Sequence, residues 1–131
     1  MEKWSVQERF SDWEQMRLAV ENALTATASH IALEEGVWYD LRVVLRELAC
    51  NALEHGKTPV ELSISTCCDQ EHLHVLVCDA GEGFDPCAEG TLLEVDQARG
   101  RGLHIVNSLS EAMAYNAAAN KVLVRLRIAG G

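Results

Sequence analysis

The chain has 131 residues, of which 48% are hydrophobic, 24% charged and 5% aromatic, with nine glycines and two prolines. This is the size of one domain spanning 1–131, and the composition excludes a collagen-like or low-complexity chain. A net charge of −9 disfavours nucleic acid and anionic lipid as partners. Because no apolar run approaches the roughly 18 residues that cross a bilayer, we expect neither a membrane helix nor a signal peptide.

The first half of the chain reads as mainly helical. Residues Ser5 to Phe10 are short and ambiguous, and an edge strand is one interpretation. A helix is predicted from about Asp12 to Ser29, with apolar side chains along one side, namely Trp13, Met16, Val20 and Leu24. After a break at Glu34–Gly36, a second helix is predicted from Val37 to about His55, ending at Gly56. Its apolar stripe follows helical spacing: Leu41, Leu45, Leu48 and Ala52.

The second half reads as mainly strands. Two alternating segments, Val60–Cys68 and His72–Cys78, flank a polar turn and predict an antiparallel hairpin. A glycine-rich loop from Asp79 to Arg101 is long enough to suggest function, and Gly102–Met113 has a helical pattern. A last strand is predicted over Lys121–Ile128. The order of elements predicts an α+β fold, a two-layer sandwich of helices over a mixed, mainly antiparallel sheet.

Five cysteines, an odd number, include no C-x-x-C pair, which argues against a zinc site or a thioredoxin-like motif. We expect buried or free thiols in a reducing cytoplasm.

Glu47, Asn51 and His55 are spaced four residues apart and form one row on the second helix. A carboxylate and an amide oxygen one turn apart suit a hard cation such as Mg²⁺, whose other ligands are water and phosphates. The alternative is an ordinary solvated edge of the helix.

Asp79 directly follows an apolar strand and shares a strand face with Val75 and Val77, so its carboxylate should point between sheet and helices. A buried carboxylate accepts hydrogen bonds, which fits an exocyclic amine such as that of adenine. Gly81 and Gly83 would let backbone approach a ligand closely. A plain turn is the alternative.

A third cluster, Gly100-Arg101-Gly102-Leu103, opens the predicted third helix. Free amide donors and the dipole at a helix start attract phosphate, and Arg99 and Arg101 add local positive charge. A flexible hinge before a core helix is the alternative.

Taken together, E-x-x-x-N on a helix, D-x-G-x-G-F after a strand and G-x-G-L-x-I-V at a helix start resemble the GHKL nucleotide-binding superfamily of gyrase, Hsp90, histidine kinases and MutL. The resemblance covers Leu41 to about Val124. Within the superfamily, the chain is most similar to the stand-alone anti-sigma-factor serine/threonine kinases of bacteria.

The resemblance implies the helix-over-sheet (Bergerat) ATP-binding fold, with ATP and Mg²⁺ as cofactors. It implies Glu47 as catalytic base or water-orienting group, Asn51 as Mg²⁺ ligand beside it, and Asp79 as the adenine acceptor. Gly81 and Gly83 would form the loop at the adenine, and the end of a lid over the phosphates would consist of Arg99, Gly100, Arg101, Gly102 and Leu103.

The implied function is a cytoplasmic kinase that sequesters a sigma factor and phosphorylates a STAS-type antagonist protein, which switches partners. The sequence departs from the superfamily pattern in two places, an acidic lid and the turn Ala119-Asn120-Lys121, which often carries glycine in relatives. A non-catalytic or weakly catalytic ATP-binding module is therefore an alternative function. The catalytic domain of a histidine kinase is a further alternative, although His30 lacks the proline-containing acceptor box. Trp4, Trp13 and Trp38 could form a homodimer surface in the N-terminal region or pack in the core.

Overall fold

A computed structural model of the chain describes residues 4–66, 71–81, 104–115 and 120–128. Two long helices, α1 (Trp13–His30) and α2 (Glu35–His55), follow the first strand, β1 (Ser5–Phe10). The remaining strands are β2 (Val60–Thr66), β3 (His72–Cys78), β4 (Ala112–Tyr115) and β5 (Lys121–Arg127). Residues 104–109 are also helical. None of the helices in the described part is long and apolar enough to cross a membrane.

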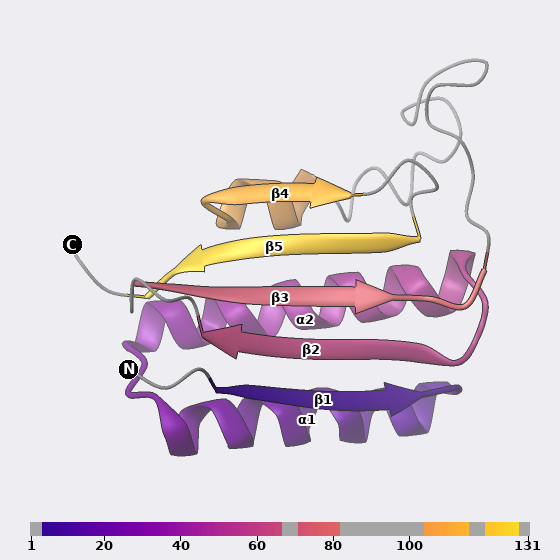
Figure 1. The fold of residues 1–131 in the computed structure, drawn as a ribbon, viewed down its shortest axis with the longest axis horizontal. Coiled ribbons are helices and arrows are strands. Elements are labelled where there is room, and N and C mark those ends of the chain that lie inside the picture. The colour runs from indigo at the N-terminus through magenta and orange to yellow at the C-terminus, as the bar shows by residue number, and fades with distance from the viewer. Residues whose placement is uncertain (1–3, 67–70, 82–103, 116–119, 129–131) are drawn as a thin grey trace.

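The five strands form one sheet in the order β1-β2-β3-β5-β4, and each neighbouring pair is antiparallel. The helices lie on one face of this sheet (Figure 1). The predicted two-layer α+β sandwich is therefore confirmed, with a sheet that is antiparallel throughout its described pairs rather than mixed. The ambiguous segment Ser5–Phe10 forms an edge strand, one of the interpretations that the sequence allowed.

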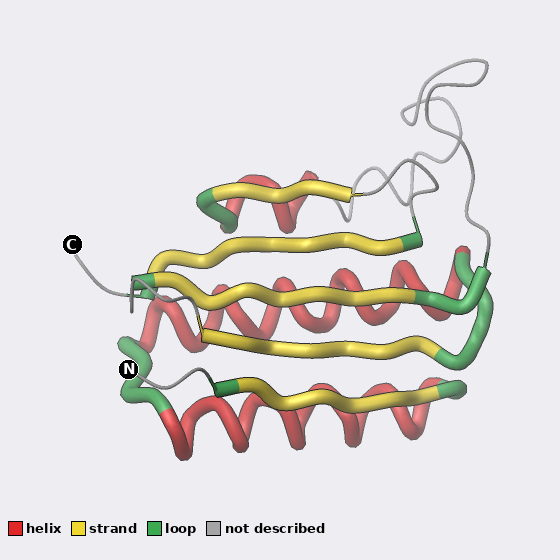
Figure 2. Tube along the Cα trace, in the orientation of Figure 1, coloured by secondary structure: helices red, strands yellow, loops and turns green. Residues whose placement is uncertain are grey.

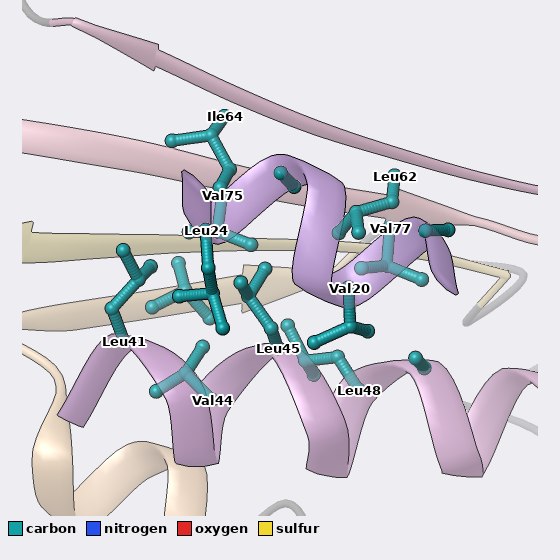
Figure 3. Close-up of a cluster of buried hydrophobic side chains, with 14 of the residues drawn as sticks. Val20, Leu24, Leu41, Val44, Leu45, Leu48, Leu62, Ile64, Val75 and Val77 are labelled. Atoms are coloured by element: carbon teal, nitrogen blue, oxygen red, sulfur yellow. The ribbon is translucent and has the colours of Figure 1, made fainter. Parts of the chain in front are cut away.

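The core lies between the helices and the inner face of the sheet (Figure 3). The predicted stripe of α2 is buried there, with Leu41 and Leu45 fully inaccessible. It meets side chains of β2 and β3 that alternate inward, such as Ile64 and Val75. Burying each such side chain contributes about 1.5–3 kcal/mol, which is what holds α2 against the sheet. On α1, Trp13 departs from the prediction, because 51% of it is exposed at the start of the helix.

Local signals set the ends of the helices. Asp12 caps α1, since its Oδ1 accepts the Gln15 N–H at 2.7 Å. Helix α2 begins at Glu35, two residues earlier than predicted. A carboxylate in the first turn is favoured by the helix dipole, and this offsets the poor helix propensity of Gly36. The helix ends at His55 with Gly56 as its C-cap, as predicted.

The predicted helix over Gly102–Met113 is wrong in its second half. Within it, the helical residues 104–109 give way to β4, whose Met113 pairs with Val124 of β5. The Ser110 N–H donates to the Asn107 carbonyl and its hydroxyl to the Val106 carbonyl, so the chain turns here. Pairing with the edge of β5 gives hydrogen-bond partners to a row of backbone N–H and C=O groups. This pairing outweighs the preference for a helix that the apolar spacing indicates.

The loops that join the described elements gather at the two ends of the sheet (Figure 2). At one of these ends the C-terminal ends of α2 and β3 come together with the start of β5 (Figure 1). This end carries the candidate site.

Candidate functional site

Three segments far apart in the sequence are joined by backbone hydrogen bonds at this end of the sheet. Lys57, just past α2, accepts the Ala80 N–H at 2.7 Å on its carbonyl and donates its own N–H to Asp79 Oδ1 at 3.4 Å. The Asp79 N–H donates to the carbonyl of Asn120, just before β5, at 3.0 Å. The loop after β3 is thus held from both sides.

Asp79 is buried, with 8% of its surface exposed. It continues the inward side of β3 after Val75 and Val77, as the strand alternation predicts. Its Oδ1 accepts the Gly81 N–H at 2.7 Å as well as the Lys57 N–H. Its Oδ2 accepts no hydrogen bond from the described residues, so an oriented acceptor on a largely buried side chain is left for a ligand.

Gly56 determines how closely α2 approaches this carboxylate. A β-carbon at Gly56 would lie 2.4 Å from both Cγ and Oδ2 of Asp79. The backbone of Gly56 is in the extended region, at φ −102°, so its role here is to leave space. The position of Gly56 at the helix end follows from the sequence, whereas the space that it leaves for Asp79 appears only in the structure.

Asn51 and Glu47 lie on α2 on the approach to this end. Asn51 is buried at 8% exposure, and its Nδ2 has no hydrogen-bond partner among the described residues. It precedes Gly56 by five residues, about 7.5 Å along the helix axis. Glu47 is half-buried one turn further back and makes no hydrogen bond or ion pair with the described residues. His55, the third member of the predicted row, contacts Glu54 instead, at 3.5 Å.

The rest of the predicted site lies outside the described residues. It comprises Gly83, Arg99, Gly100, Arg101, Gly102 and Leu103. The structure brings Asp79 and Gly81 against the C-terminal end of α2, the helix that carries Asn51 five residues before Gly56. The contacts around Asp79 also involve Gly56, Lys57 and Asn120, none of which the sequence predicted to belong to the site.

Comparison with protein families identifies this arrangement of elements. The family model for the histidine kinase-like ATPase domain matches residues 10–128, nearly the whole chain. The chain belongs to this family. The predicted GHKL resemblance is thereby confirmed, and domains of this family bind ATP, usually with Mg²⁺. A comparison with curated proteins finds no match.

The residues of this ATPase domain fit such a ligand. A buried amide group without a hydrogen-bond partner, such as the Nδ2 of Asn51, costs on the order of 1–3 kcal/mol. A ligand that accepts a hydrogen bond from this group would remove that cost. The amide and carboxylate oxygens of Asn51 and Glu47 are of the type Mg²⁺ prefers. In the described ranges, no group of three His, Cys, Asp or Glu side chains converges on one point, so phosphates and water would complete the coordination.

Two cysteines flank the site of the ATPase domain, and both are free thiols. Burial is the main cause that raises the pKa of Cys50, with Glu47 adding to it. Burial likewise raises the pKa of Cys78, which directly precedes Asp79. Because a raised pKa keeps a thiol protonated at neutral pH, neither cysteine is suited to act as a nucleophile.

A separate groove runs over the helical layer of the ATPase domain. It has a volume of about 520 Å³ and lies between α1 and α2, sharing no lining residue with the site around Asp79. Its lining combines the exposed Trp13 with Val20 and three arginines, Arg17, Arg42 and Arg46. Arg42 is paired with Glu21 inside the groove.

Proposed function

We propose that this ATPase domain is an ATP-dependent serine/threonine protein kinase and anti-sigma factor, which phosphorylates a STAS-type antagonist protein. The observation that carries the ATP site is the Asp79 carboxylate with its open Oδ2 against the end of α2, the helix on which the amide of Asn51 is buried and unpaired among the described residues. The serine/threonine specificity and the sigma-factor partner are supported by the motif resemblance alone, and so is a cytoplasmic location.

Asp79 would recognise the base of the nucleotide. A carboxylate oxygen accepts a hydrogen bond from the exocyclic amine of adenine, whereas it repels the carbonyl oxygen at the same position of guanine or hypoxanthine. Because Oδ1 is already occupied by the Gly81 and Lys57 amides, Oδ2 is the oxygen that would face the base. Gly81 and Gly83 would form the loop beside it.

Asn51 and Glu47 would act at the phosphate end. Mg²⁺, when bound, neutralises charge on the phosphates that are transferred. Asn51 would supply one of its ligands, and Glu47 would stand beside it, to accept the proton of the attacking hydroxyl or to orient that hydroxyl. The segment from Arg99 to Leu103, with Gly100, Arg101 and Gly102 between them, would cover the phosphates with its backbone amides and arginines.

A phosphotransfer assay tests the proposal. Full-length protein is incubated with labelled ATP, Mg²⁺ and a candidate antagonist, in parallel with Asn51→Ala and Glu47→Ala. We expect acid-stable phosphate on the antagonist with wild type and a loss of at least a hundredfold with either variant. The control is Asp40→Asn, since Asp40 lies at the opposite end of α2. Unchanged transfer by Asn51→Ala would contradict the assignment, and acid-labile phosphate would favour the histidine-kinase alternative.

The groove between α1 and α2 favours a second candidate, a partner-binding module that holds ATP only as a structural ligand. A concave surface that combines an exposed tryptophan with arginines is typical of protein interfaces. Such a module would bind nucleotide without turnover. Detectable turnover that Glu47→Ala abolishes would exclude this candidate and leave the kinase.

A further inference from the structure

We propose that Asn120 is a positioning residue that fixes the loop 79–81, and thereby the carboxylate of Asp79, for recognition of adenine. This inference rests on the proposed ATP site. Asn120 lies in the turn where the chain departs from the glycine that relatives often carry, and no motif marked it.

Asn120 contacts the loop through two groups. Its carbonyl accepts the Asp79 N–H at 3.0 Å, which extends the β3–β5 ladder one step past the pair Cys78–Lys121. Its side-chain Nδ2 donates to the Gly81 carbonyl at 2.8 Å, across 39 residues of sequence. One residue thus holds the loop at its first and its third position.

Gly81 passes this constraint on to Asp79. Its N–H donates to Asp79 Oδ1 at 2.7 Å, while its carbonyl is held by the Asn120 amide. A β-carbon at Gly81 would lie 2.9 Å from Asp79 Oδ1, so loop and carboxylate are packed without spare room. Because Oδ1 is tied to Gly81, the orientation of the carboxylate and the direction of Oδ2 depend on where Gly81 lies.

The chemistry of this link is specific to an amide side chain. An aspartate at position 120 has nearly the same shape, but its carboxylate cannot donate to the Gly81 carbonyl and places a second negative charge near Asp79. An alanine removes the donor without adding a charge. Both substitutions keep the backbone carbonyl that binds the Asp79 N–H, so they isolate the side-chain contact.

The experiment compares base selectivity by titration calorimetry on the full chain, with ATP and inosine triphosphate, each with Mg²⁺. Inosine triphosphate replaces the exocyclic amine of adenine by a carbonyl oxygen, so wild type should prefer ATP. Asn120→Ala should weaken ATP binding about five- to tenfold, the worth of one hydrogen bond, and lower the ratio of the two affinities by a similar factor. Asn120→Asp should lower the ratio further.

The ratio separates positioning from a merely structural effect. A general loss of folded protein lowers both affinities together and leaves their ratio unchanged, a result that would overturn the inference. Asn22→Ala, on the exposed side of α1, is the matched control and should change neither affinity. If Asn120→Ala fails to fold, the near-isosteric Asn120→Asp carries the test. Wild type that binds neither nucleotide would refute the ATP site itself, whereas a wild-type preference for ATP retained by both variants would refute only the role of Asn120.

Discussion

Gly56 and Asp79 approach each other so closely that no side chain fits between them. The C-cap of α2 lies directly against the carboxylate that follows β3, and a β-carbon there would come within 2.4 Å of its Cγ. Because Asp79 is buried and held by two backbone amides, it has little room to move away. The closeness of helix and strand at this point therefore determines where the acceptor oxygen lies.

Gly56→Ala should displace the Asp79 carboxylate and weaken binding of ATP and ADP at least tenfold. The added methyl group is an overpacking change, which costs about 1–3 kcal/mol of folding free energy and should leave the protein folded. Calorimetry with each nucleotide and thermal unfolding measure the two effects. The control is Gly36→Ala at the other end of α2, where a β-carbon meets no atom of the described residues within 4 Å. Equal nucleotide affinities of the two alanine variants would contradict the prediction.

Asn51→Leu should stabilise the nucleotide-free protein while it abolishes nucleotide binding. The Nδ2 of Asn51 is buried with no partner in the described part of the chain, and removing such a group recovers about 1–3 kcal/mol. Thermal unfolding without ligand should show a higher midpoint than wild type. With saturating Mg²⁺–ATP the order should reverse, since only wild type gains the binding free energy, about 2.7 kcal/mol at a hundredfold excess over Kd.

Leucine also has a higher helix propensity than asparagine. The control variant Asn22→Leu, at an exposed position of α1, measures how much this propensity contributes to the change in stability. A ligand-free Asn51→Leu protein less stable than wild type would mean that the amide of Asn51 is satisfied in solution.

Asp12→Ala should reduce stability without affecting nucleotide affinity. The Asp12 side chain caps α1 through the Gln15 N–H, and the Gln15 side chain in turn accepts the Ser11 N–H at 2.8 Å. Loss of such a cap costs about 1 kcal/mol. Chemical denaturation checks the cost, and calorimetry checks the affinity. A drop in ATP affinity would show that the start of α1, which lies at the same end of the sheet as the site, is coupled to nucleotide binding.

The sequence predicted the structure correctly where the spacing of apolar residues within one helix or strand determines which side is buried. The stripe of α2 and the alternation through Val75, Val77 and Asp79 follow from spacing alone, and they identify the buried carboxylate. Met113 shows the limit, because helical spacing predicted a helix there, whereas pairing with Val124 on the following strand makes it part of β4. The same limit hid Asn120 and Lys57. Their importance arises from contacts with the loop after β3, and no periodicity within their own segments reports these contacts.

Glu111 should make the protein sensitive to acid. Its Oε2 accepts the Nε2–H of buried His72 at 2.7 Å and lies 3.4 Å from Arg127 Nε, so it ties the turn before β4 to the ends of β3 and β5. The hydrogen bond from His72 is the main cause that lowers the pKa of Glu111 below its ordinary value of 4.5. A lowered pKa in the folded state contributes stability above pH 4.5, and this contribution is lost as the pH falls through the lowered value.

Glu111→Gln should therefore be less stable than wild type at pH 7, and its stability should fall less steeply below pH 4.5. Urea unfolding at a series of pH values between 7 and 3 measures both differences. Glu14→Gln is the control, because the ion pair of Glu14 with Arg17 is exposed on both sides and a pair of that kind contributes little. Parallel pH profiles for wild type and Glu111→Gln would show that the His72–Glu111 contact does not carry the acid sensitivity.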